Sequence, residues 1–205
     1  MKFFSIDSKL YKIMTPIAEM MILNFCWILG CLPLITIGAA NTAMYTVMGR
    51  RLRDEGSGTI VPFFQAWWRN MKKSTVFWLA QAFITVSLGM FFFLPLPLFL
   101  RIVAGVLLVL VTLVFSTIYP QIARFRNRPF AYLRNSVILD VLKLGRVFLN
   151  LLLWLSPLGF FLLMPYEFLQ LGLIWIFFGF SLLFYLSAQL MQSILAPLEE
   201  LAENR

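Results

Sequence analysis

The side chains able to carry chemistry are few, and their spacing matches no common catalytic site. The 205-residue chain contains no histidine. This excludes serine–histidine and cysteine–histidine nucleophile pairs and histidine-ligated metal sites. No phosphate loop of the form G-x-x-x-x-G-K-[ST] occurs, and the glycines of "DEGSGT" at 54–59 have the wrong spacing for one. The sequence therefore predicts a protein that is not an enzyme and that has no cofactor and no metal ion.

The remaining reactive or polar side chains are isolated from one another. Glu19 and Glu167 lie near predicted helix ends, where water is within reach, so we interpret both as interfacial. Asp140 lies in a basic region and is expected to pair with a nearby arginine or lysine. Cys26 and Cys31 fall on different faces of one predicted helix, which argues against a disulfide between them. Scattered amides able to bond between helices are Asn24, Asn41, Gln81, Asn150 and Gln189.

The composition predicts that these side chains are carried by membrane helices. Hydrophobic residues make up 61% of the chain and charged residues 13%, and the mean hydropathy is +0.86. An ordinary water-soluble domain is far more polar. The net charge of +8 is interpreted as cytoplasmic loops that contact anionic membrane lipids, rather than as a nucleic-acid-binding surface.

Five apolar stretches are long enough to cross a bilayer, which takes about 20 helical residues. They cover 17–35, 76–98, 102–122, 147–164 and 168–191. Residues 36–52 are a sixth candidate, which either crosses or re-enters without crossing. We therefore expect an all-α integral membrane protein that forms a single transmembrane domain over 1–205. It has about six transmembrane helices, or five if 36–52 is re-entrant.

The positive charges favour six crossings. If 36–52 crosses, 16 of the 17 lysines and arginines share one side of the membrane, and only Arg101 lies on the other. That side is then the cytoplasmic one, with both termini, in a bacterial cytoplasmic membrane. If 36–52 does not cross, Lys2, Lys9 and Lys12 move to the opposite side.

Two short motifs occur twice in the same order. Tyr45 and Arg50 in "TAMYTVMGR" correspond to Tyr119 and Arg124 in "STIYPQIAR", and "AWWRN" at 66–70 corresponds to "AYLRN" at 131–135. Each pair of motifs leads into an apolar span. The pattern indicates a duplicated unit of helix, basic segment and helix over 36–98 and 102–164, with chance similarity as the alternative.

The stretch "PLITIGAANTAMY" at 33–45 interrupts the first apolar run. A signal-peptidase site is one interpretation, but the apolar run of 17–37 exceeds the 7–15 residues of a signal core. A hairpin fits better, because small side chains let a returning helix pack closely against a neighbour in lipid. The residues of this helix-packing hairpin are Pro33, Thr36, Gly38, Ala39, Thr42 and Ala43.

Two basic amphipathic segments, 61–74 and 126–146, are expected to lie in the membrane interface. In the first, Phe64, Trp67, Trp68 and Met71 form the predicted apolar face, opposite Gln65, Arg69, Lys72 and Lys73. The segments act either as lipid anchors or as a docking surface for a partner. The candidate docking residues are Phe64, Ala66, Trp67, Trp68, Arg69, Asn70, Lys73, Arg134 and Asn135.

The order of "LPLITIGAANTAMY", "FFQAWWRNMKKS" and "YPQIARFRNRPFAYLRNSV" resembles the YesL-like family of small bacterial membrane proteins over nearly the whole chain. That family has no established catalytic activity. Its members are encoded beside carbohydrate ABC importers and glycan-degrading enzymes in Gram-positive bacteria. The family-like positions are Pro33, Thr36, Gly38, Ala39, Phe64, Ala66 and Asn70.

The resemblance implies a non-enzymatic accessory subunit of an ABC-type oligosaccharide importer. In this hypothesis the small-residue hairpin packs against the permease helices, and the basic segments face the cytoplasm. An alternative is a small transporter or channel that works alone and uses polar residues such as Asn41, Gln81 or Gln189. A membrane sensor or assembly factor is a further alternative.

Overall fold

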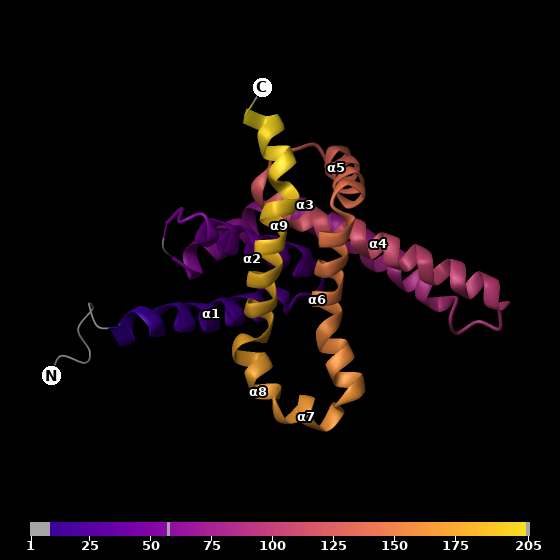
Figure 1. The fold of residues 1–205 in the computed structure, drawn as a ribbon, viewed down its shortest axis with the longest axis horizontal. Coiled ribbons are helices and arrows are strands. Elements are labelled where there is room, and N and C mark those ends of the chain that lie inside the picture. The colour runs from indigo at the N-terminus through magenta and orange to yellow at the C-terminus, as the bar shows by residue number, and fades with distance from the viewer. Residues whose placement is uncertain (1–8, 57, 204–205) are drawn as a thin grey trace.

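The computed structural model describes residues 9–56 and 58–203, and in these ranges the chain is helical without a strand, as expected (Figure 1). Lys2 and Arg205, two of the cations predicted to share one side, lie outside the described residues, as do the side chains of Lys9 and Lys12. The elements are α1 (Lys9–Cys31), η1 (Leu34–Thr36), α2 (Ile37–Leu52), α3 (Ile60–Met90), α4 (Leu98–Arg124), α5 (Pro129–Leu142), α6 (Leu144–Leu163), α7 (Pro165–Gln170), α8 (Gly172–Ile174), the π-helical η2 (Trp175–Gly179) and α9 (Phe180–Glu203).

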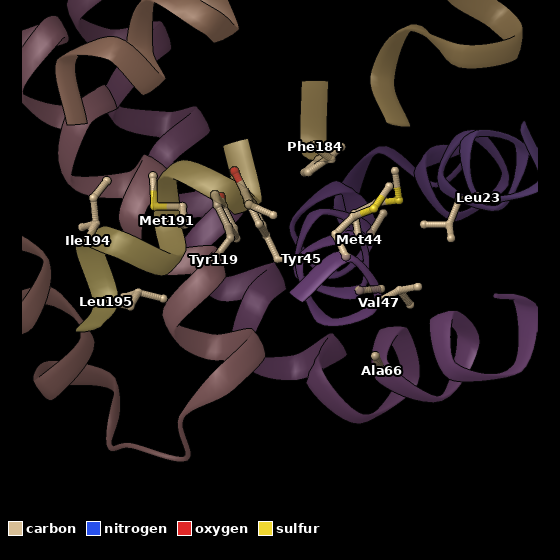
Figure 2. Packing of buried hydrophobic residues seen from close by; sticks show 14 of the residues in the cluster. Leu23, Met44, Tyr45, Val47, Ala66, Tyr119, Phe184, Met191, Ile194 and Leu195 are labelled. Carbon is tan, nitrogen blue, oxygen red and sulfur yellow. The ribbon is translucent and has the colours of Figure 1, made fainter. Parts of the chain in front are cut away.

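Helix α2 is the centre of the fold. It contacts α1, α3, α4 and α9, and nine of its sixteen residues are buried. Side chains from these helices gather around Met44, among them Leu23 of α1, Ala66 of α3 and Phe184 of α9 (Figure 2). Because its own chain covers it on several sides, α2 is a core helix rather than a helix surrounded by lipid.

Two helical hairpins extend from this centre in different directions (Figure 1). Helices α3 and α4 form one hairpin, and α6 and α9, joined through α7 and α8, form the other. Their tips are strongly apolar and open: Phe93 is 92% exposed and Leu163 is 85% exposed. Side chains of this kind are stable when the tips and flanks lie in lipid or against another apolar surface.

Four helices in the described part of the chain are long and apolar enough to cross a membrane, so six crossings are not confirmed. They are Met14–Cys31, Leu98–Arg124, Leu144–Leu163 and Gly172–Ala196. The sixteen residues of α2 span only about 24 Å, against about 30 Å of hydrocarbon. Helix α3 is long enough, but its first half carries Arg69, Lys72 and Lys73.

The segment 61–74 is helical and is continuous with the apolar segment that follows it, and its placement in the membrane interface stays a prediction. Helix α3 runs without interruption from Ile60 to Met90, so the basic segment and the following apolar segment share one axis. Its buried side chains are Phe63, Ala66, Asn70, Ser74 and Phe77, whereas the predicted apolar-face residues Phe64 and Trp68 are exposed, as Arg69 is.

The two proposed repeat units are built differently in their second halves. Residues 61–90 of the first unit lie in one helix, whereas the corresponding part of the second unit divides at Lys143 into α5 and α6. Their first halves are alike, because α2 and α4 each carry an arginine in the last turn. The duplication over 36–98 and 102–164 stays a prediction.

Candidate functional site: two adjoining cavities beside Tyr45

The small residues of the predicted hairpin pack against the protein's own helix α3. Gly38, Ala39, Thr42 and Ala43 are buried, and the Thr42 and Ser74 hydroxyls share a hydrogen bond of 2.8 Å. The expectation that this face packs against permease helices is therefore wrong, because the chain itself already covers it.

The turn before α2 is the open part of the hairpin. Pro33 is exposed there. Thr36 is buried, and its hydroxyl donates to the carbonyl oxygen of Gly30 at 2.8 Å. This bond ties the end of α1 to the start of α2 and satisfies a carbonyl that the end of α1 leaves without a helical partner.

The predicted docking residues do not form one surface. Ala66 and Asn70 are buried, and Trp67 and Asn135 are half-buried. The indole Nε1 of Trp67 donates to the Gly30 carbonyl oxygen at 3.3 Å. The members of the set that remain exposed are Phe64, Trp68, Arg69, Lys73 and Arg134.

The structure instead brings four arginines to one cavity of about 290 Å³, here called the arginine cavity. Arg50 and Arg53 reach it from the end of α2, Arg69 from α3 and Arg124 from the end of α4. The described residues that line it include no carboxylate. The remaining wall combines polar and apolar residues, which are Tyr45, Thr46, Gly49, Pro120, Ala123, Ala188, Met191, Gln192 and Leu195.

The local sequence explains why cations gather at this point. Arg50 and Arg124 lie in the last turns of their helices, where a positive side chain interacts favourably with the helix dipole. Asp54, Gly56 and Gly58 have positive φ angles of 53°, 102° and 135°. Such angles suit glycine and are tolerated by aspartate, and they turn the chain sharply back towards the end of α2.

That turn places Glu55 beside Arg53. The Nε and Nη2 atoms of Arg53 donate to the two carboxylate oxygens of Glu55 at 2.7 and 2.9 Å, and Nη2 of Arg50 donates to the Glu55 carbonyl oxygen at 3.2 Å. The hydrogen bonds from Arg53 hold the pKa of the Glu55 carboxyl below its usual value. Glu55 thus supplies one negative charge at the rim of the arginine cavity.

A second cavity of about 210 Å³, here called the aromatic cavity, also borders Tyr45. It brings together two of the three polar residues predicted for a solute path, Asn41 and Gln81, whereas Gln189 is exposed elsewhere on α9. Trp27 donates to the Asn41 amide oxygen at 2.9 Å, and Tyr119 donates to the Gln81 amide oxygen at 2.7 Å. Aromatic donors therefore hold both amides in place. The other lining residues are Trp78, Thr112, Ser116, Leu151, Trp154 and Phe184.

Among the residues that sequence reasoning did not select are Tyr45, Arg50, Tyr119 and Arg124. Both tyrosines line the aromatic cavity, and both arginines line the arginine cavity. They are the matched positions of the two similar motifs, so the internal comparison contained the signal that could have found them. The contribution of α9, with Ala188, Met191 and Leu195, had no comparable signal.

A family model described as "Protein of unknown function, DUF624" matches residues 20–93, which is less than half of the chain. The matched region contains the second half of α1, all of α2 and α3, and three of the four cavity arginines, Arg50, Arg53 and Arg69. No curated protein and no solved structure matches the chain.

Proposed function

We propose that this chain is a YesL-like accessory subunit of an ABC-type carbohydrate importer and that it has no catalytic activity of its own. The order of motifs along the chain supports the family, and the match at 20–93 is consistent with it. In this role the chain binds the permease subunits within the bilayer, and its exposed hairpins are the binding surface.

The observation that carries the proposal is how little the candidate spans pack against their own chain. Between 17% and 33% of the residues in each candidate span are buried inside the protein. Helices in lipid associate by close packing and hydrogen bonding, because lipid tails are as apolar as leucine. The side chains that these spans leave unburied are available for close packing against a further membrane protein, and the proposal assigns this surface to the permease subunits.

The position of the four cavity arginines supports an orientation of the protein in the membrane. Arg50, Arg53, Arg69 and Arg124 meet at one cavity, and positively charged segments of bacterial membrane proteins are retained in the cytoplasm. In the proposed orientation the arginine cavity faces the cytoplasm of a bacterial cell. The termini then lie on the cytoplasmic side.

Copurification tests the proposal. A tagged protein isolated in mild detergent from its own cells is expected to carry permease subunits of a carbohydrate importer in stoichiometric amounts. A tagged membrane protein of similar size from the same cells provides the control for non-specific association. Recovery of the chain without permeases, even after crosslinking in intact cells, contradicts the proposal.

A second candidate function is transport by this chain alone, and the aromatic cavity favours it. The cavity combines aromatic walls with Asn41, Gln81, Thr112 and Ser116, a lining typical of sites for small neutral polar molecules. This function predicts solute uptake by liposomes that contain only this protein. An accessory subunit predicts no uptake above that of empty liposomes.

A further inference from the structure

We propose that the arginine cavity binds a phosphate-bearing anion, supplied either by the headgroup of an anionic phospholipid or by a free phosphate. This inference does not depend on the importer partner, because it rests only on side chains within the described chain. Four guanidinium groups line the cavity and one carboxylate, that of Glu55, pairs at its rim.

Arginine suits phosphate better than lysine does. Its planar guanidinium offers parallel N–H donors whose spacing matches two phosphate oxygens, and it stays charged at every physiological pH. Three of the four arginines come from different helices, with Arg50 on α2, Arg69 on α3 and Arg124 on α4. Guanidinium groups that reach one cavity from separate helices are placed to contact the same anion from several sides.

The shape of the cavity favours a phosphate attached to an organic group. Its volume of about 290 Å³ lies near the lower end of the roughly 300–1,000 Å³ typical of small-molecule sites. The arginines share the lining of the cavity with the apolar side chains of Met191 and Leu195 of α9. An anionic lipid presents this combination of a phosphate and an adjoining apolar part.

Glu55 is the internal competitor for the same cations. Its carboxylate occupies the fork of Arg53 at 2.7 and 2.9 Å, and its backbone carbonyl occupies one donor of Arg50. Removal of the Glu55 charge therefore strengthens binding of an external anion, whereas removal of an arginine weakens it. These opposite effects on anion binding, from the loss of Glu55 and from the loss of an arginine, distinguish a specific binding site from general attraction to a basic surface.

The experiment uses the full chain in nanodiscs of phosphatidylcholine. Short-chain phosphatidylglycerol, short-chain phosphatidylcholine and inorganic phosphate are titrated separately, and binding is followed by the change in tryptophan fluorescence. The variants are Arg69→Gln, Arg69→Lys and Glu55→Gln, and the control is Arg128→Gln. Arg69, Glu55 and Arg128 are exposed, so these changes are expected to leave the fold intact.

Saturable binding of phosphatidylglycerol but not of phosphatidylcholine is expected if the ligand is a lipid. If inorganic phosphate binds saturably, with an affinity equal to or higher than that of phosphatidylglycerol, the site is assigned to a free phosphate. In either case Arg69→Gln weakens binding about tenfold and Arg69→Lys weakens it less, since the loss of one charge-assisted contact has about this effect. Glu55→Gln strengthens binding several-fold, and Arg128→Gln leaves it unchanged.

Two results overturn the proposal. One is the absence of saturable binding of either ligand to the native chain. The other is equal weakening by Arg69→Gln and Arg128→Gln, because it assigns binding to the overall positive charge of the protein.

Discussion

Gly38→Val is expected to lower the free energy of unfolding by about 3 kcal/mol, as overpacking of a closed site does when it cannot relax. A Cβ atom at Gly38 would lie 2.7 Å from Cβ of Trp78 and closer still to the carbonyl oxygen of Ser74. Both neighbours belong to the helix α3 scaffold, which cannot move aside as a flexible side chain does. Helix α2 must then separate from α3, and the Thr42–Ser74 hydrogen bond at the same crossing is lost.

Gly159→Val is the matched control. It introduces the same side chain into helix α6, where a Cβ atom at Gly159 meets nothing within 4 Å. Thermal unfolding in detergent, followed by tryptophan fluorescence, compares the two variants with the native chain. A clear drop in melting temperature is expected for Gly38→Val alone, and equal melting temperatures for both variants would disprove the tight α2–α3 crossing.

Asp140→Asn is expected to stabilise the protein by roughly 2 kcal/mol above pH 6. Asp140 of α5 is only 7% exposed, and neither of its carboxylate oxygens has a hydrogen-bond partner. Thr117 lies opposite it on α4, but the Thr117 hydroxyl donates its proton to the Val114 carbonyl oxygen at 3.0 Å. The predicted pairing of Asp140 with a lysine or arginine is therefore wrong, and burial raises the pKa of Asp140 to about 6.

The direction of the pH effect follows from that pKa. Below about pH 4 the Asp140 carboxyl is neutral in the folded and unfolded chain, so it carries no charge penalty. Between pH 4 and pH 6 it ionises first in the unfolded chain, and the native protein loses stability as the pH rises. The stabilisation of Asp140→Asn is expected to grow over this interval and to remain constant above it.

Unfolding midpoints in denaturant at pH 4 and pH 7.5 measure this difference. The change Asp54→Asn at an exposed carboxylate is the control, for which we expect little change in stability. A difference between Asp140→Asn and the native chain that is the same at both pH values would contradict the account of Asp140.

The central helix α2 was predictable from sequence, but the face of α3 that packs inside the protein was not. The stretch 36–52 corresponds closely to α2 (Ile37–Leu52), because a proline and a cluster of small residues mark a turn clearly. In α3 the apolar pattern singled out Phe64 and Trp68, which are exposed, and gave no sign that Asn70 and Ser74 are buried inside the protein. In lipid, close packing and hydrogen bonds rather than hydrophobicity select the inward face, so a hydrophobic pattern does not identify it.

The candidate site was predictable only in part. Similar motifs pointed to Tyr45, Tyr119, Arg50 and Arg124 as equivalent positions, and the structure places each equivalent pair at one cavity. Helix α9 contributes lining residues to both cavities, and these lie more than 130 positions away from Tyr45 in the sequence. Met191 lines the arginine cavity and Phe184 lines the aromatic cavity. Contacts over such separations depend on helix packing, which no local pattern encodes.

Site-specific photocrosslinking in living cells tests most directly whether the exposed hairpins bind another membrane protein. Photoreactive residues are placed at Phe83 of α3 and Leu155 of α6, which are exposed on the two hairpins, and at Phe130 of α5, which is exposed outside the candidate spans. The account predicts crosslinks from Phe83 or Leu155 to permease subunits of a carbohydrate importer, and none to them from Phe130. Crosslinks from both hairpin positions to lipid alone, in cells that express the importer, would contradict it.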